Sequence, residues 1–261
     1  MANLIKRIVR KLKSLNKKDE HKNGPLFCPV CSNNLAFFNP LPQVYADNAK
    51  IHGFKYFGQN EHLNIHQYSC PKCGSSDRDR FYASFFKNFA LNDELKGTLL
   101  HVAPAWKLND LFLKEHYQVT TTDLMMDGVD DQLNIEDLHA YEDNSFDYFI
   151  CSHVLEHVDD PDKALSELYR VLKPDGRGII MAPINPNISE TIEDSTVTTK
   201  EGRIRHFGQE DHLRLFAKKD FMNRIEKVGF KLAMLGKSDF GEATFKKIGL
   251  RDSSILYIGI K

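Results

Sequence analysis

Four cysteines in the first third of the chain stand in two Cys-x-x-Cys pairs, Cys28 with Cys31 and Cys70 with Cys73. Each pair offers two thiolates from one tight turn, and together they make the tetrahedral sulfur set that Zn²⁺ prefers. Two reduced or redox-active pairs are the alternative. With four thiolates bound, zinc has no open position for water, so we expect a structural ion that does not catalyse. The fifth cysteine, Cys151, is expected to be a small buried hydrophobic residue.

The elements that would position chemical groups follow from residue 98 onward, where short apolar segments alternate with amphipathic ones. A helix near 160–172 has Asp160 as its N-cap and Pro161 as its first residue. This alternation predicts an α/β, Rossmann-like, mostly parallel sheet with helices on both faces. The predicted strands are 98–103, 118–122, 146–151, 178–182, 229–235 and 254–260, and the other predicted helices are 106–115 and 218–228.

Candidate ligand contacts lie where these strands end, because doubly wound sheets bind ligands beyond the carboxyl ends of their strands. The first end is His101–Ala105, which includes Ala103 and Pro104. Asp123 follows the second strand, where a carboxylate would accept hydrogen bonds from both hydroxyls of a nucleoside ribose. A surface aspartate without a ligand is the alternative.

A third candidate is the loop 134–138. In a nucleoside site, Ile135 would lie on the adenine ring. An acceptor at Asn134 or Glu136 would then meet the exocyclic amine of that ring.

The segment from Ser145 to Val158, with the sequence SFDYFICSHVLEHV, resembles the class I S-adenosylmethionine-dependent methyltransferases, type 11-like. Asp160-Pro161 and the sequence VLKPDG at 171–176 extend the resemblance, which is close over 98–182. It implies a sheet of seven strands and S-adenosyl-L-methionine as cofactor. It also implies that Ser152 and His153 contact the cofactor or shape its pocket.

One stretch departs from that family. Its first loop is usually glycine-rich, whereas residues 101–106 contain no glycine, although relatives with a four-cysteine module are similar in having Ala-Pro here. The same absence counts against a dinucleotide dehydrogenase, which needs a glycine turn for its pyrophosphate. A sulfonium cofactor has no phosphate, and its positive charge suits Asp123, Glu136 and Asp137.

Methyl transfer is an in-line displacement, so the protein must align the acceptor and, where needed, remove its proton. His153 and His157 are four residues apart with Glu156 between them. His153 is a candidate base or cofactor contact, and for His157 a structural role is favoured. The long insertion 183–217 is expected to be a lid, in which His212 and Arg214 are the candidate acceptor-side residues and a solvated loop is the alternative.

Charge is distributed unevenly along the 261 residues, although 35 Lys and Arg nearly balance 36 Asp and Glu. Residues 1–18 hold seven of the basic residues and no acidic one, which leaves 28 basic against 36 acidic residues in the rest. An apolar stripe in 4–15 predicts a basic amphipathic helix that would lie on an anionic membrane surface. No segment is long and apolar enough to cross a bilayer or to resemble a secretory leader, so a cytoplasmic location, peripheral to the inner membrane face, is expected.

The expected domains are a basic helix with linker at 1–23, a zinc-ribbon module at 24–76 and a methyltransferase domain at 77–261. Three functions remain open. The first is methyl transfer to a small molecule or glycan near a membrane. The second is methylation of RNA, such as ribosomal RNA, gripped by the ribbon and the basic leader, although the acidic balance of the body counts against it. The third is a binding protein that has lost catalysis.

Overall fold

The structure, a computed structural model, describes residues 24–90 and 97–261, so the predicted basic helix lies outside the described residues. Its central sheet has six strands in the order β10-β11-β6-β5-β3-β4, and it is mostly parallel, with β11 running antiparallel to both neighbours. The predicted fold class is therefore confirmed. The strands are β3 (Thr98–Val102), β4 (Gln118–Thr122), β5 (Phe146–Ser152), β6 (Leu172–Met181), β10 (Lys231–Leu235) and β11 (Leu256–Ile260).

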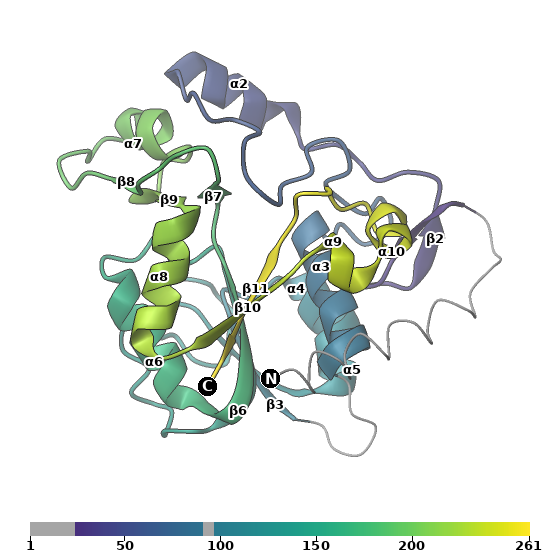
Figure 1. Ribbon diagram of the computed structural model, residues 1–261, viewed down its shortest axis with the longest axis vertical. Coiled ribbons are helices and arrows are strands. Elements are labelled where there is room, and N and C mark those ends of the chain that lie inside the picture. Colours follow the sequence, from purple (N-terminus) through teal and green to yellow (C-terminus); the bar gives the residue numbers. More distant parts are fainter. Residues whose placement is uncertain (1–23, 91–96) are drawn as a thin grey trace.

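Helices cover both faces of this sheet (Figure 1). On one face lie α6 (Pro161–Val171), which Asp160 caps by accepting from the N–H groups of Asp162 and Lys163, and α8 (Lys218–Val228). The other face is covered by α3 (Asp77–Phe85), π-helix η1 (Phe86–Ala90), the series α4 (Trp106–Leu108), η2 (Asn109–Leu113) and α5 (Lys114–His116), and the short helices α9 (Lys237–Phe240) and α10 (Glu242–Lys247). Among the described residues, no helix is long and apolar enough to span a bilayer.

The seventh strand is not formed in the described part of the chain, which corrects the expectation from the resemblance. Beyond the edge strand β4 there is an isolated bridge between Thr122 and Asp131. The Asp130 carboxylate accepts from both the N–H and the hydroxyl of Thr121, at 2.8 and 2.7 Å. A side chain thus satisfies a donor on the edge of β4, so the outer strand is reduced to a single bridge.

The cysteine module contains a hairpin of β1 (Leu26–Cys28) and β2 (Asn33–Leu35) and the helix α2 (Gln43–His52). The sequence gives no signal for α2 because this helix has no buried stripe: Ala49 is buried, whereas Val44 and Ile51 are exposed. Helical periodicity in a sequence comes from such a stripe. As expected for so small a module, its buried residues belong to the same continuous core as the sheet.

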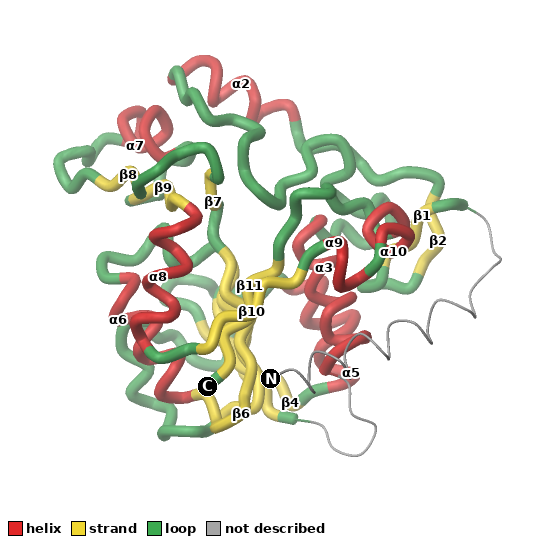
Figure 2. Tube along the Cα trace, viewed as in Figure 1, coloured by secondary structure: helices red, strands yellow, loops and turns green. Residues whose placement is uncertain are grey.

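The insertion after β6 is ordered. It forms a three-stranded sheet in the order β7-β9-β8, from β7 (Ile184–Asn185), β8 (Ile192–Glu193) and β9 (Arg214–Ala217), together with α7 (Lys200–Phe207). In Figures 1 and 2, α7 and α2 lie at the same end of the molecule, opposite the C-terminus. Because β11 runs antiparallel to β6, that end is the carboxyl end of the parallel strands.

A buried guanidinium joins the module to the α/β domain. Arg80 is fully buried and lies in the first turn of α3. This helix starts with a capping box formed by Ser76 and Asp79. The Arg80 side chain also lies 3.7 Å from the centre of the Phe38 ring. Its nitrogens donate to five backbone carbonyls, those of Gln67, Tyr68, Ser75, Ile248 and Gly249. The guanidinium thereby links the module, α3 and the end of α10.

We expect Arg80→Met to lower the free energy of unfolding by about 3 kcal/mol or more, because several buried carbonyls lose their donor and each unsatisfied group costs roughly 1–3 kcal/mol. Urea unfolding followed by circular dichroism measures this change. The control is Arg205→Met, since Arg205 donates one bond to the His52 carbonyl from an exposed position and should cost about 1 kcal/mol at most. Equal effects of the two substitutions would contradict the role given to Arg80.

Candidate active site

The carboxyl ends of β3, β4 and β5 meet at one edge of the sheet. In the register, Val102 pairs with Thr122 on one side and with Cys151 on the other. The next residues, Ala103, Asp123 and Ser152, therefore lie together at this edge, where Ser152 is the last residue of β5. The chain winds to β4 on one side of β3 and then to β5 on the other, so this edge is the point where the winding reverses and where ligands bind in such sheets.

Two non-glycine residues at this edge have left-handed backbone conformations: Ala103 with φ +47° and His153 with φ +58°. Such a conformation costs on the order of 1–3 kcal/mol and persists where surrounding contacts enforce it. Here the N–H of Ala103 donates to the Thr122 carbonyl and that of His153 donates to the Met181 carbonyl. The loop 101–106 contains no glycine, and Ala103 adopts the left-handed conformation that glycine adopts more readily.

The other residues predicted at the ends of β3, β4 and β5 lie close to this edge. Asp123 is half-buried; one of its oxygens accepts from the N–H groups of Met125 and Met126, and no described residue hydrogen-bonds to the other. His101 is buried, and burial lowers its pKa to about 4, so the neutral ring accepts the N–H of Ala105 at 3.3 Å. Ser152 Oγ lies 2.7 Å from Tyr82 Oη. Pro104 is buried.

The loop 134–138 packs against the core and the start of α6. Ile135 is 4% exposed and packs in the core. The Glu136 carboxylate accepts the N–H of Asp160 at 2.9 Å, and the Asn134 side chain accepts the N–H of Glu136. These side chains hold the loop against the start of α6. The sequence analysis did not anticipate this use of their acceptors.

The residues fit the sugar of a nucleoside cofactor better than its base. Asp123 offers a carboxylate oxygen free of hydrogen bonds from the described residues, and its neighbours Ala103 and Ser152 stand at the adjoining strand ends. These groups could hold the ribose and the amino-acid part of S-adenosylmethionine.

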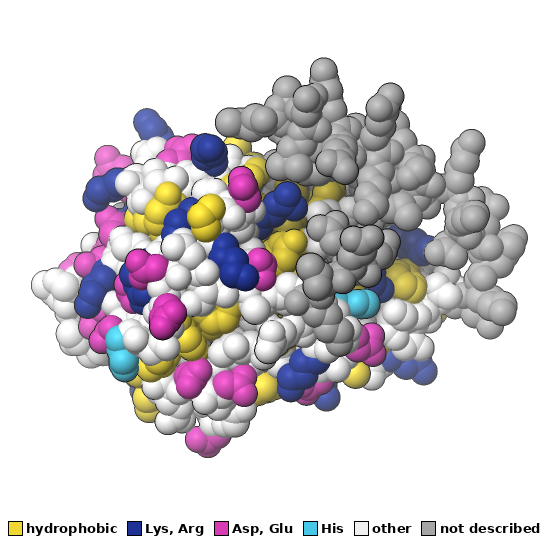
Figure 3. Space-filling model, turned by 90° about the horizontal axis from the view of Figure 1, so that it is seen from below, with side chains coloured by type: hydrophobic (Ala, Val, Ile, Leu, Met, Phe, Trp, Pro, Cys, Tyr) yellow, Lys and Arg dark blue, Asp and Glu magenta, His cyan; other side chains and the backbone are white. Residues whose placement is uncertain are grey.

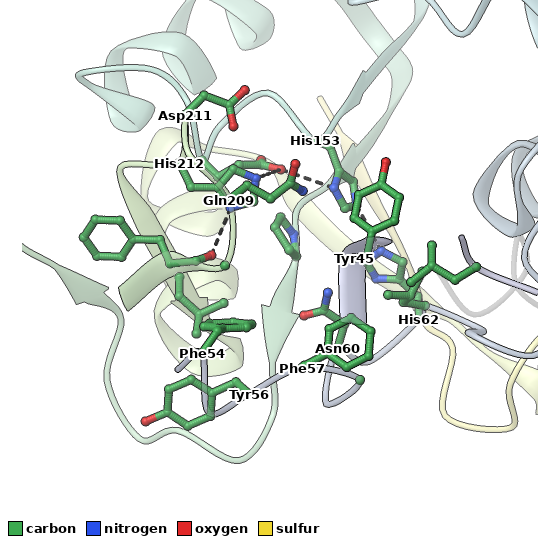
Figure 4. A pocket seen from close by; sticks show the side chains of 18 of the residues that line it. Tyr45, Phe54, Tyr56, Phe57, Asn60, His62, His153, Gln209, Asp211 and His212 are labelled. Carbon is green, nitrogen blue, oxygen red and sulfur yellow. Dashed lines mark hydrogen bonds and ion pairs between the residues drawn. The ribbon is translucent and has the colours of Figure 1, made fainter. Parts of the chain in front are cut away.

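A cavity of about 330 Å³ adjoins this edge. Three separate parts of the chain form its walls: residues 41–78 of the module and the start of α3, the loop after β5, and the insertion from 207 to 215. In Figure 4, Phe54, Tyr56 and Phe57 lie below, and His153 and His212 above. Of the predicted cofactor contacts, His153 alone lines the cavity, which places this residue between the strand ends and the enclosed space.

Four histidines and one carboxylate cluster on the upper wall. His62 Nε2 lies 3.0 Å from His153 Nε2, and His153 Nδ1 lies 3.2 Å from a Glu156 oxygen. Burial lowers the pKa values of His62, His153 and His212, and it raises the pKa of Glu156. The candidate base His153 and the candidate acceptor-side residue His212 therefore meet at one wall.

Arg214 does not line this cavity, although it was expected on the acceptor side. Its guanidinium is buried and donates to the carbonyls of Leu155, Val158 and Asp159, and it also pairs with Glu193 at 2.6 Å. Since these carbonyls belong to the loop that carries His153, we infer that Arg214 positions this loop and does not touch a substrate.

Sequence reasoning missed the contribution of the module to the cavity. Tyr45, the aromatic residues at 54–57, His62 and Arg78 all lie in its walls. The high density of aromatic residues between the two cysteine pairs was a signal, but the sequence did not show that this segment folds over the end of the sheet.

The four paired cysteines lie together, as the spacing predicts. Sγ of Cys28 is 3.8 Å from that of Cys73, Sγ of Cys31 is 3.9 Å from that of Cys70, and all four sulfurs lie within 4.8 Å of one another. All four cysteines are free. Such a set fits one tetrahedral Zn²⁺. Cys151 is buried, as expected.

Residues 107–180 match the family model described as a methyltransferase domain. Residues 107–180 are therefore similar to a methyltransferase domain, as the resemblance in the sequence predicts.

Among curated proteins, the ubiquinone/menaquinone biosynthesis C-methyltransferase UbiE of Brucella canis is 35% identical over 112 residues, which are 38% of this chain and 41% of that protein. The protein of the same name from Haemophilus ducreyi is 48% identical over 50 residues, or 19% of each chain. The chain thus spans less than half the length of these relatives.

Solved structures with a similar arrangement include an S-adenosylmethionine-dependent methyltransferase from Archaeoglobus fulgidus, with 15% identity, a TM-score of 0.46 and coverage of 72% of this chain and 95% of that one. The [4+2]-cyclase SpnF has 16% identity, a TM-score of 0.48 and coverage of 85% and 97%.

We expect a mercurial thiol reagent to release about one zinc ion per chain, because all four sulfurs would bind the same ion. A metal-sensitive dye measures the release. Cys31→Ser should abolish it and should increase proteolysis of residues 24–76, whereas Cys151→Ala, which removes the thiol outside the cluster, should leave it unchanged. Full release from Cys31→Ser would contradict the four-cysteine site.

Proposed function

We propose that this protein transfers a methyl group from S-adenosylmethionine to a small-molecule acceptor held in the cavity beside the end of β5. The observation that carries the proposal is the position of His153. This residue directly follows β5 at the edge where the carboxyl ends of β3, β4 and β5 meet, and it also lines the cavity. A volume of about 330 Å³ is within the size range of small-molecule sites.

When bound, S-adenosylmethionine supplies a methyl group on a positively charged sulfur that is open to in-line attack. Asp123 holds the ribose through its carboxylate, and the turn at Ala103 lets the backbone approach the cofactor. The module and the insertion cover the carboxyl end of the sheet and exclude water from the acceptor. The main contribution of the protein is alignment of the two reactants.

His153 is the base in this proposal for an acceptor that carries a proton. Burial lowers its pKa, so its ring is neutral near pH 7 and can accept a proton. The Nε2 atom faces Nε2 of His62 at 3.0 Å, so one of the two nitrogens carries a hydrogen and the other accepts it. His62 can thereby orient the ring and accept a proton in turn.

The walls of the cavity suggest an acceptor with a flat ring and a negative group. Phe54, Tyr56 and Phe57 offer aromatic surface on one side. Arg78 lines the cavity, and its guanidinium has no hydrogen bond or ion pair with any residue of 24–90 or 97–261. An anionic group on the acceptor would provide this partner. A ring is also consistent with the quinone pathway in the printed name of the curated relatives.

The other functions have less support from the described residues. Figure 3 shows the end of the molecule opposite α2 and α7, where Lys and Arg side chains are interspersed with Asp and Glu and do not gather in a stripe suited to an RNA backbone. Residues 1–18, which carry the membrane hypothesis, lie outside the described part of the chain. A protein without catalysis would bind the cofactor but release no S-adenosylhomocysteine with any acceptor.

We expect Asp123→Asn to raise the Kd for S-adenosylmethionine by about 10-fold to 100-fold, because a hydrogen bond to a charged group contributes roughly 1.5–3 kcal/mol. Asparagine keeps the oxygen that accepts from Met125 and Met126, so the turn should survive. Isothermal titration calorimetry measures the affinity, and Asp127→Asn on the same loop is the control. An unchanged affinity in Asp123→Asn would show that the cofactor binds elsewhere.

We expect His153→Gln to lower kcat by roughly 10²–10⁴-fold, the usual contribution of a general base. The measurement is release of S-adenosylhomocysteine, with an acceptor selected from a panel of hydroxylated aromatic acids, quinols and sugar acids. Cofactor affinity should stay within a few fold, and His139→Asn, an exposed histidine outside the cavity, should be fully active. Turnover by RNA alone, or by no member of the panel, would contradict the small-molecule proposal.

A further inference from the structure

Glu156 is a fully buried carboxylate whose two oxygens accept no hydrogen bond from the described residues. Ionised carboxylates are rarely buried unless they are paired or coordinate a metal. Three imidazoles surround one oxygen instead: Nδ1 of His153 at 3.2 Å, Nε2 of His157 at 3.9 Å and Nε2 of His212 at 4.0 Å. This group therefore lacks the partners that its burial demands.

The far nitrogens of two of these rings have acceptors of their own. Nδ1 of His212 lies 3.1 Å from the Phe207 carbonyl, and Nδ1 of His157 lies 3.3 Å from the Asp211 carbonyl and 3.4 Å from its carboxylate. A neutral ring donates its hydrogen to such an acceptor. Each Nε2 atom is then left with a lone pair, and both lone pairs face the Glu156 carboxylate.

Lone pairs on two nitrogens and a carboxylate repel one another unless a positive charge lies among them. We propose that Glu156, His157 and His212 bind a divalent transition-metal ion such as Zn²⁺ or Co²⁺, as a second site distinct from the cysteine cluster. The three ligand atoms lie within 4.8 Å of one another. Binding requires them to approach to roughly 3.3 Å, the separation in a tetrahedron with bonds of about 2.0–2.1 Å, which small side-chain rotations allow.

The surroundings match those of metal sites with an exchangeable ligand. Two histidines and one carboxylate leave at least one coordination position free. The carbonyl and carboxylate partners of the outer nitrogens orient the rings, as in other histidine–metal sites. All three ligand residues also line the cavity, so the free position points to the space where the acceptor would lie.

An oxygen of the acceptor is the ligand that this position would take. A bound cation lowers the pKa of a coordinated hydroxyl, which would help to form the nucleophile for methyl transfer. This role rests on the proposed function, whereas binding of the ion does not.

The test titrates Co²⁺ alone, without any cofactor, into the full-length protein that carries one equivalent of zinc. Mass spectrometry of metals should find about two ions per chain, of which a thiol reagent releases one. Where cobalt enters the second site, it should give visible absorption without the sulfur charge-transfer band of a cysteine site. Glu156→Gln and His212→Asn should bind the second ion about 100-fold more weakly or not at all, and His139→Asn should match the wild type.

Each outcome decides the proposal. A wild-type chain with no second ion, or variants that bind it as tightly as the wild type, would overturn the site and leave protonated histidines as the partners of Glu156. If Glu156→Gln and His212→Asn fail to fold, His157→Asn gives the decision, because His157 is half-exposed and its replacement disturbs the core least. Calorimetry with S-adenosylhomocysteine on the same samples tests the methyltransferase proposal separately.

Discussion

The rest of this structure depends on the hydrogen bonds that the buried guanidinium of Arg80 donates to backbone carbonyls. A buried arginine must satisfy its donors within the protein, and here backbone carbonyls from three segments do so. Those segments are the strand-like end of the module, the turn before α3 and the end of α10. Because the carbonyls are part of the main chain, the contact fixes how the module sits over the sheet. The aromatic wall of the cavity therefore depends on a contact that lies outside the cavity.

Arg214 is a second buried arginine that donates to backbone carbonyls. Its hydrogen bonds to the carbonyls of the loop after β5 join this loop to the insertion, and its pair with Glu193 lies within the insertion. Between the two arginines, the chain encloses a space beside the cofactor edge in which several polar side chains are buried. Burial lowers the pKa values of His153 and His212 and leaves Glu156 without a hydrogen-bond partner among the described residues. Groups in this state are common at sites that bind ligands or catalyse.

Sequence patterns predicted well those features that come from local periodicity or from chemistry at fixed spacing. Strand β4 and helix α8 have their predicted bounds, and the Asp160 cap starts α6 as expected. The burial of Ile135 and Arg214 did not follow from the sequence, because it depends on which way a side chain faces. An apolar residue in a loop can cover a ligand or fill the core, and only packing decides between the two.

By itself, the sequence determined the α/β class, the four-cysteine cluster and the position of Asp123 at a strand end, because each follows from spacing along the chain. Only the tertiary structure shows that the module covers the carboxyl end of the sheet. It also brings four histidines and the buried carboxylate of Glu156 to one wall of the cavity, namely His62, His153, His157 and His212. These residues are up to 150 positions apart, from His62 to His212. Contacts over such distances arise from the shape of the packed core, and no local pattern encodes them.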